Sequence, residues 1–209
     1  MISERLRTLL SAHTPRDGSP LLLARAVGFV ATLLIAAIFG FFYAWVCSTM
    51  WGLDAADPRV AIAAMQAMNG SVRNAVFFPA FFLTPAVLAL AGALARHSGR
   101  NVSASYFGAS AVLYLVGGLL LTMLVNVPMN EALGQVVVPE SVPEAASVWS
   151  AYSTPWQRWN LARTFASGLS LTLALLATKA LVVLCNRCTP TPPATGDRPL
   201  GESRLGECC

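Results

Sequence analysis

Four long apolar blocks constrain the fold of this chain more than any other feature of its sequence. They run from about Ala26 to Met50, Ala75 to Ala95, Ala109 to Val127 and Leu161 to Leu184. Each has roughly the 20 mainly apolar residues that a helix needs to cross a bilayer. Charged residues make up 11% of the chain, against about 25% in an average soluble domain. The sequence therefore predicts an all-α fold, a four-helix transmembrane bundle in an integral, multi-pass membrane protein.

The segments outside the blocks divide the chain into three parts. Residues 1–20 form a polar or amphipathic leader, which we expect to lie on the membrane surface. Residues 21–188 are expected to form the four-helix membrane domain, and residues 189–209, rich in proline, glycine and polar residues, are expected to be a disordered cytoplasmic tail. Small residues let helix backbones approach each other in a membrane. The glycines expected at helix contacts are Gly40, Gly92, Gly117, Gly118 and Gly168.

Two of the connections between the blocks have local signals of their own. Asp57 is a candidate N-cap and Pro58 stands at the first helical position, so we expect a short extracytoplasmic helix before the second span. Residues 134–155 hold three prolines, the last of them Pro155, and are expected to form the longest external loop.

The distribution of basic residues predicts the orientation of the chain. Arginine and lysine gather before the first block, in the second connection and after the fourth block. The first and third connections carry five of the ten acidic residues: Asp54, Asp57, Glu131, Glu140 and Glu144. Because cytoplasmic loops are enriched in lysine and arginine, both termini are expected in the cytoplasm. Lipid headgroups account for the net charge of +4, so no nucleic-acid partner is implied.

Polar and aromatic side chains recur at helical spacing where each block reaches the outer side. Asn126 and Asn130 are four residues apart and share a helix face, and Pro128 between them removes a backbone donor. The other residues on matching faces are Tyr43 at the end of the first block, Asn69, Arg73 and Asn74 before the second, and Trp156, Trp159, Asn160 and Arg163 at the start of the fourth. Ionisable residues inside a membrane bundle are functional candidates by default, so we predict that these side chains line one pocket.

Each of these residue types also has a purely structural interpretation. Trp156 and Trp159 suit the aromatic belt at a membrane interface, which needs no ligand. The asparagines suit hydrogen bonds between helices. Arg73 and Arg163 lie near helix ends, from which their charged groups could extend to the lipid headgroups. The matching faces at one depth favour a site over these separate interpretations.

Three segments of the chain resemble the anthrone-oxygenase-like family of small four-helix membrane proteins. They are "AMQAMNGSVRNAVFF", "NVPMNEAL" and "WQRWNLARTFAS". In that family a Met-Gln-x-x-Asn segment precedes the second helix, an Asn-x-Pro-x-Asn segment ends the third, and a Trp-x-x-Trp-Asn-x-x-Arg-Thr segment begins the fourth. The resemblance runs from about Ala31 to Ala180 and adds Gln66 to the candidate residues.

The resemblance implies that an anthrone is oxidised to an anthraquinone with dioxygen and without a metal. An anthrone, or a hydroquinone, can lose a proton, and the electron-rich anion can then pass an electron directly to dioxygen. Such an enzyme needs an apolar slot for a flat substrate and donors that stabilise the oxyanion. The expected partners are membrane lipids, dioxygen and a lipophilic aromatic small molecule.

The helix faces and the resemblance together assign roles to the candidates. Arg73, Asn126, Asn160 and Arg163 are expected to be catalytic, and Tyr43, Gln66, Asn69, Asn74, Asn130, Trp156 and Trp159 to bind the substrate. Glu131 is the carboxylate nearest in sequence to the cluster and is the candidate base. The alternative function is a non-catalytic membrane protein that binds a quinone-like ligand or a partner protein.

No cofactor is expected. His13 and His97 lie outside the four blocks, so the sequence does not predict a histidine-ligated haem, di-iron or copper centre in the bundle. An alternative is Cu(I) bound by Cys47 and the methionines near the outer end, although methionines commonly fill gaps in a core. Cys185 and Cys188 allow a thiol-redox pair, but reversible acylation suits cysteines at a helix end better, and the absence of any functional role suits them better still.

Overall fold

The computed structural model describes residues 19–183, which contain helices and no strands. In chain order the helices, with π-helical segments labelled η, are α2 (Ser19–Ala44), η1 (Trp45–Thr49), α3 (Met50–Ala55), α4 (Pro58–Ser71), α5 (Phe77–His97), α6 (Asn101–Tyr114), η2 (Leu115–Leu120), η3 (Thr122–Asn126), α7 (Val127–Gly134) and α8 (Val142–Val183). The predicted tail, nearly all of the predicted leader, and Cys185 and Cys188 lie outside the described residues.

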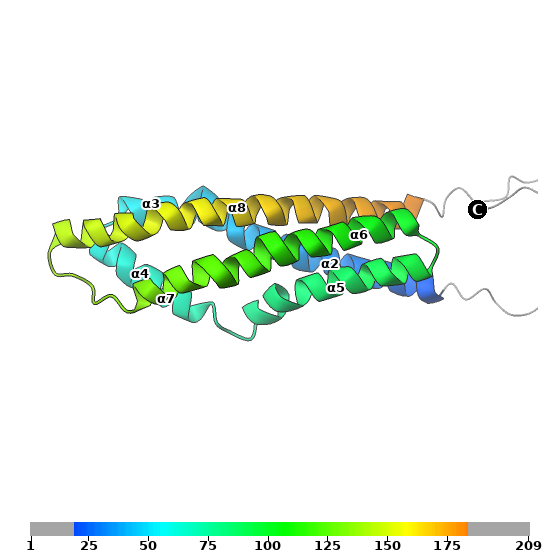
Figure 1. The fold of residues 1–209 in the computed structure, drawn as a ribbon, viewed down its shortest axis with the longest axis horizontal. Helices are drawn as coiled ribbons and strands as arrows, with labels where there is room; N and C mark the ends of the chain where they lie inside the picture. Colours follow the sequence, from blue (N-terminus) through cyan, green and yellow to red (C-terminus); the bar gives the residue numbers. More distant parts are fainter. Residues whose placement is uncertain (1–18, 184–209) are drawn as a thin grey trace, which may run out of the picture.

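The described helices form one elongated bundle of four long rods (Figure 1). One rod is α2 to α3, one is α5, one is α6 to α7 and one is α8. Four helices are long and apolar enough to cross a membrane: Ser19–Ala55, Phe77–His97, Asn101–Gly134 and Val142–Val182. The predicted four-helix membrane bundle is confirmed, and a short helix, α4, precedes the second span. The chain is a multi-pass membrane protein.

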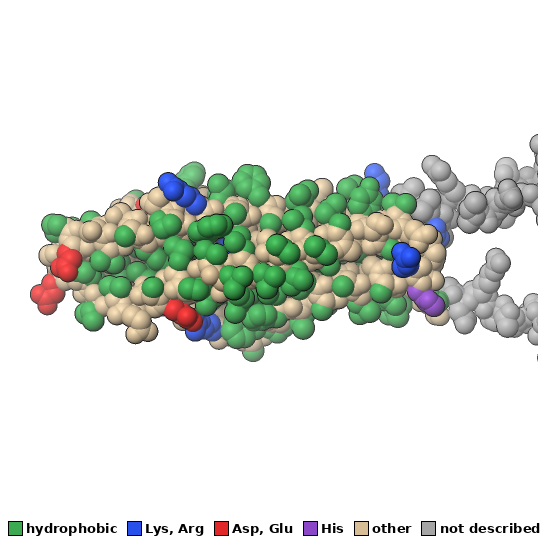
Figure 2. Space-filling model, in the orientation of Figure 1, with side chains coloured by type: hydrophobic (Ala, Val, Ile, Leu, Met, Phe, Trp, Pro, Cys, Tyr) green, Lys and Arg blue, Asp and Glu red, His purple; other side chains and the backbone are tan. Residues whose placement is uncertain are grey.

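The rods differ in length, and the difference defines two ends of the bundle. Helix α5 has 21 residues, which at about 1.5 Å per residue is close to the thickness of the hydrocarbon layer. Helix α8 has 42 residues and therefore extends well past α5. We call the end with α3, α4, α7 and the start of α8 the distal end, and the end with Ser19 and Val183 the proximal end. On the face shown in Figure 2, the charged side chains gather near these ends, and a band rich in hydrophobic side chains lies between them.

The expected external loop at residues 134–155 is wrong. Only residues 135–141 connect α7 to α8, and Pro155 lies inside α8. Pro143 is the second residue of α8. Its missing backbone N–H costs little there, because the N–H groups in the first turn of a helix have no carbonyl partner within the helix. Glu144 lies in the same first turn, where its negative charge interacts favourably with the positive end of the helix dipole.

The start of α8 is held against α3 by hydrogen bonds to the exposed carboxylate of Asp54. Asp54 Oδ1 accepts hydrogen bonds from Trp149 Nε1 at 2.9 Å and from Ser153 Oγ at 2.7 Å. Its second oxygen accepts from Gln157 Nε2 at 2.8 Å. The three donors lie four residues apart along one face of α8, so the contact requires this segment to be helical.

Inside the membrane domain, one side chain compensates for a proline. Pro85 lies within α5 and has no N–H to donate to the carbonyl of Phe81, four residues earlier. The hydroxyl of the buried Tyr114 donates a 2.8 Å hydrogen bond to that carbonyl instead. This bond joins α5 to α6 close to the aromatic residues described below.

Most of the glycines expected at helix contacts do lie there. The prediction holds for Gly92, Gly117 and Gly168, where an added Cβ would crowd another helix. At Gly117 that Cβ would lie 2.5 Å from the Cβ of Ala166 in α8. Gly118 instead faces the ring of Tyr114 in its own rod, and a Cβ at Gly40 would meet no atom within 4 Å. The prediction is therefore wrong at Gly40.

Candidate functional site

A cavity of about 280 Å³ lies in the distal half of the bundle, where α4 ends and α5 begins. Residues from α2, η1, α4, α5, η3, α7 and α8 surround it. Eight of its eighteen lining residues are aromatic: Phe41, Phe42, Trp45, Phe77, Phe78, Phe81, Phe82 and Trp156. Its polar and charged lining residues are Asn69, Arg73, Thr122, Asn130, Glu131 and Arg163. The cavity thus joins an apolar slot to a small number of polar groups, which is the usual composition of a small-molecule site.

Two of the three π-helical segments flank this cavity. Trp45 in η1 and Thr122 in η3 line it. A π turn inserts a residue into an α-helix and rotates the side chains that follow, and such turns are frequent at functional sites. The π turns therefore set which residues of two rods face the cavity.

Arg163 is the buried charge of the site. Its side chain is 4% exposed. Nη1 donates to Thr122 Oγ1 at 3.2 Å and Nη2 donates to Asn160 Oδ1 at 2.7 Å. The guanidinium carbon lies 4.6 Å from the ring centroid of Phe42 and 5.2 Å from that of Trp156.

The arginine has donors that the described residues do not satisfy. No carboxylate within residues 19–183 forms an ion pair with it, and its Nε has no hydrogen-bond partner in that part of the chain. Buried charges are normally paired, since an unpaired one costs several kcal/mol. The arrangement favours an anionic or strongly accepting ligand in the cavity.

Asn160, one turn before Arg163 in α8, accepts a hydrogen bond from the guanidinium and fixes its position. The amide is 1% exposed and does not line the cavity. Since arginine only donates, the oxygen of Asn160 must face Arg163, and its Nδ2 donates at 3.1 Å to the carbonyl of Phe42. Both ends of the Asn160 amide are therefore paired with other groups of the protein.

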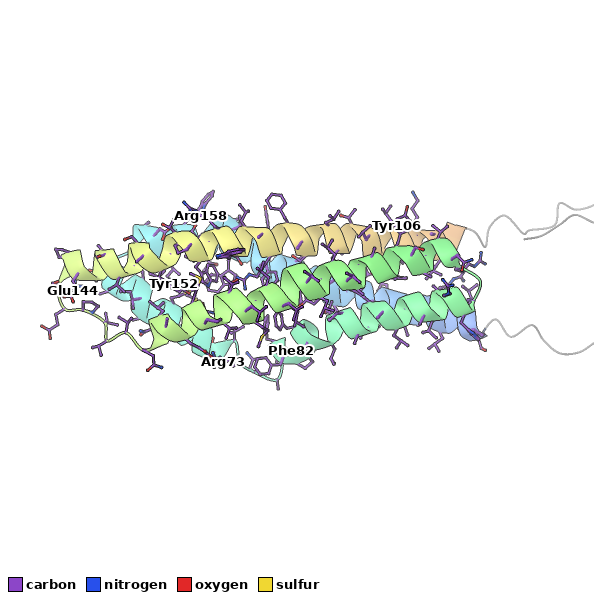
Figure 3. All side chains as sticks on the ribbon, viewed as in Figure 1. Arg73, Phe82, Tyr106, Glu144, Tyr152 and Arg158 are labelled. Atoms are coloured by element: carbon purple, nitrogen blue, oxygen red, sulfur yellow. The ribbon has the colours of Figure 1, made fainter. Side chains whose placement is uncertain are left out.

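Asn130 is oriented by two aromatic donors. Its Oδ1 accepts hydrogen bonds from Trp156 Nε1 and from the hydroxyl of Tyr152, both at 2.8 Å. Because the indole N–H only donates, the amide orientation is fixed, and Nδ2 has no hydrogen-bond partner among residues 19–183. Tyr152 points from α8 toward α7 (Figure 3), and Asn130 lines the cavity with a donor available. Sequence reasoning missed Tyr152, although it lies four residues before Trp156 on the same face.

The mouth of the cavity carries an ion pair. Nη2 of Arg73 lies 3.2 Å from Oε1 of Glu131, and both side chains are about half exposed. They join the end of α4 to α7, and Figure 3 shows Arg73 on the α4 side near Phe82. Asn69, one turn before Arg73, lines the cavity with its Nδ2 buried and without a partner among the described residues.

The structure gathers six predicted residues around the cavity: Asn69, Arg73, Asn130, Glu131, Trp156 and Arg163. Two other candidates have local structural contacts. Gln66 Nε2 donates to the carbonyls of Leu133 at 2.8 Å and Val136 at 2.9 Å, which secures the end of α7. Asn74 Oδ1 accepts from the backbone N–H groups at the start of α5 and therefore acts as its cap.

The remaining candidates also lie outside the lining. Tyr43 is 50% exposed and stacks on Phe39 with ring centroids 5.8 Å apart. Trp159 is 43% exposed, as an interfacial anchor would be. Asn126 is fully buried, and neither atom of its amide has a partner among the described residues.

Sequence reasoning overlooked the aromatic wall of the cavity. The signal was present as paired phenylalanines in "GFFYAW" at the end of the first block and "FFPAFF" at the start of the second. Within an apolar block, composition alone does not distinguish aromatic rings that face lipid from rings that face a cavity.

The described residues bring no three His, Cys, Asp or Glu side chains together at metal-binding distance. The methionines considered for copper belong to different surroundings. Met50 and Met65 pack in a buried distal cluster with Trp149, whereas Met123 lines the cavity. Cys47 is exposed.

Comparison with known proteins identifies the family. No curated protein and no solved structure matches the chain. The family model described as anthrone oxygenase matches residues 68–173, about half of the chain. The match runs from the end of α4 into α8 and includes every polar residue that lines the cavity. The chain belongs to the anthrone oxygenase family.

Proposed function

We propose that the protein is a membrane-embedded oxygenase that oxidises an anthrone- or hydroquinone-type aromatic substrate with dioxygen in this cavity. One observation carries the proposal: a buried arginine, Arg163, has no carboxylate partner in residues 19–183 and faces an aromatic slot. A flat molecule that becomes an oxyanion satisfies both features. The family membership supports the same chemistry.

Aromatic and polar residues of the cavity bind different parts of the substrate. The phenylalanine rings and Trp156 stack against the flat faces of the substrate, since aromatic pairs prefer offset or edge contacts. Arg163 and the free Nδ2 of Asn130 donate to the substrate oxygen. Donors held in place before the reaction stabilise a developing oxyanion without reorganising.

The reaction begins when the substrate loses a proton and its oxygen becomes an enolate oxygen. The enolate carbon passes an electron to dioxygen, and a carbon–oxygen bond forms. One oxygen atom of dioxygen becomes the new carbonyl oxygen, and the other leaves as water with the two hydrogens of the methylene carbon. The electrons lost by that carbon reduce dioxygen completely, so the proposal needs no cofactor.

Glu131 is the proposed proton acceptor. It lines the cavity, and its Oε1 lies 3.2 Å from Nη2 of Arg73. Its half-exposed position lets the proton pass to water at the mouth. A hydroquinone would donate a hydroxyl proton to the same group, and its two electrons and two protons would convert dioxygen to hydrogen peroxide as the quinone forms.

We also propose that both termini are cytoplasmic. Among the described residues the proximal end carries Arg25, Arg96, Arg100 and Lys179 and no acidic residue, whereas all described carboxylates lie toward the distal end. This asymmetry follows the positive-inside rule. We expect that a reporter that works only in the cytoplasm is active when it is fused after Cys209. Activity of a reporter that works only outside the cytoplasm would show that the orientation is the reverse.

The test uses purified protein in lipid vesicles with an anthrone and isotopically labelled dioxygen. Empty vesicles are the control, because anthrones also oxidise spontaneously. We expect quinone production above the control, with one labelled oxygen in each quinone and one dioxygen consumed per quinone. Binding of the anthrone with no rate above the control would instead favour a non-catalytic ligand-binding protein.

A further inference from the structure

A second hollow adjoins the cavity on the side where α2 passes the junction of α4 and α5. Its volume is about 550 Å³, and it is more open than the cavity. The two spaces share five lining residues, Phe41, Trp45, Met68, Val72 and Phe77. These side chains therefore form a common wall between the hollow and the cavity.

The hollow opens at the level of the hydrocarbon layer. Helix α5 runs from Phe77 at its start to Arg96 in its last turn, a rise of about 29 Å at 1.5 Å per residue. That rise is close to the thickness of the hydrocarbon core. Phe77 and Ala80 in the hollow therefore lie near its distal boundary, and Ala37 on α2 lies at a level reached by lipid chains.

The hollow offers no obvious partner to a polar ligand. Its polar lining residues are Ser71 and Asn74. Ser71 Oγ donates to the Met68 carbonyl at 3.0 Å, and Asn74 Nδ2 donates to the Ser71 carbonyl at 2.7 Å. Asn74 Oδ1 accepts from the N–H groups of Val76 and Phe77. The side chains of Ser71 and Asn74 are thus already paired within the protein.

We propose that this hollow is the entrance through which a lipophilic aromatic substrate passes from the bilayer into the cavity. The inference rests on the proposed function for the identity of the substrate. The apolar surface admits a flat hydrophobic molecule, and rotation of wall side chains such as Met68 and Phe77 connects the two spaces. The Arg73–Glu131 mouth then serves protons and water rather than the substrate.

The test measures binding kinetics, which do not depend on turnover. Ala37 lines the hollow only and is exposed, so Ala37→Phe narrows the entrance and leaves the cavity unchanged. Ala80→Phe narrows it from α5 and serves as a second variant. Ala93→Phe is the matched control, because Ala93 is exposed on α5 and lines neither space.

The probe is an anthraquinone, the product class, dissolved in the vesicle membrane and followed by quenching of tryptophan fluorescence. We expect both entrance variants to lower the association and dissociation rates by about tenfold, within the range that association rates span among related variants. Their equilibrium affinity should stay unchanged, because an entrance affects rates alone. Control-like rates in both variants, or a loss of affinity with unchanged association, would overturn the proposal. A wild-type protein that binds anthraquinone but oxidises no anthrone would sink the proposed function and leave the entrance standing.

Discussion

Arg163 and Asn160 lie one turn apart in α8, and Nη2 of Arg163 donates a 2.7 Å hydrogen bond to Oδ1 of Asn160. The other arm of the guanidinium donates to Thr122 in η3 at 3.2 Å. Arg163 is thus fixed from two helices before any ligand arrives. Such preorganisation is what makes a donor effective toward a developing negative charge.

Asn160→Ala should weaken both folding and catalysis. The change leaves the Phe42 carbonyl and one arm of Arg163 without their partners. Each buried polar group left unpaired costs about 1–3 kcal/mol, so the unfolding free energy in detergent should fall by that order. The turnover number should fall as well, because Arg163 is less well fixed. Asn101→Ala, an exposed asparagine at the start of α6, should match wild type in both measurements.

Tyr114→Phe should destabilise the bundle only while Pro85 is present. The lost hydroxyl leaves the Phe81 carbonyl without a donor, at a cost of about 1–3 kcal/mol. Pro85→Ala supplies a backbone N–H that can donate to the same carbonyl, so the double variant should recover much of the loss. A double-mutant cycle of unfolding free energies measures this coupling. Additive effects would contradict the compensation.

Val127→Trp should block the cavity without touching its charged residues. Val127 lines the cavity from α7, so the larger side chain occupies the space of the substrate. We expect the substrate affinity to fall while the unfolding temperature changes little. Val116→Trp is the control, because Val116 is 57% exposed and lines neither space. Equal affinity in the two variants would place the substrate elsewhere.

The N-cap of α4 gives a prediction about pH. The Arg59 side chain hydrogen-bonds to Asp57 and lowers the pKa of that carboxyl from 3.8 to about 2. Because the pKa of Asp57 is lower in the folded protein than in the unfolded chain, the ionised carboxylate stabilises the fold at pH values above 3.8. This contribution is lost as the pH falls through about 2. Thermal melts of wild type and Asp57→Asn should therefore differ near neutral pH and converge near pH 2. A difference that persists there would exclude the ion pair as its cause.

The sequence predicted the membrane bundle well because spans depend on length and apolarity alone. It also predicted that Asn69, Arg73, Asn130, Trp156 and Arg163 lie near each other, since residues four apart share a helix face. That reasoning holds wherever the helix is regular.

The remaining site predictions depended on details that helical spacing does not contain. Tyr43 is expected to face the pocket, but η1 begins just after it in the same rod, and Tyr43 is exposed whereas Met50, just beyond η1, is buried. A π turn has no strong sequence signal, so this rotation was not predictable. Pro155 was read as a loop residue, although the Asp54 contacts of α8 keep that segment helical.

The central claim is that Arg163 stabilises the substrate oxyanion. Its most direct test is oxygen uptake with an anthrone by Arg163→Ala, with Arg158→Ala as the matched control. Arg158 lies on the same helix, and its side chain is exposed and points outward (Figure 3). We predict that Arg163→Ala keeps its helix content and loses about 100- to 1,000-fold in turnover number, as for a lost oxyanion donor. Arg163→Lys should recover little, because an ammonium lacks the planar fork, and Arg158→Ala should match wild type. Wild-type turnover by folded Arg163→Ala would contradict the account.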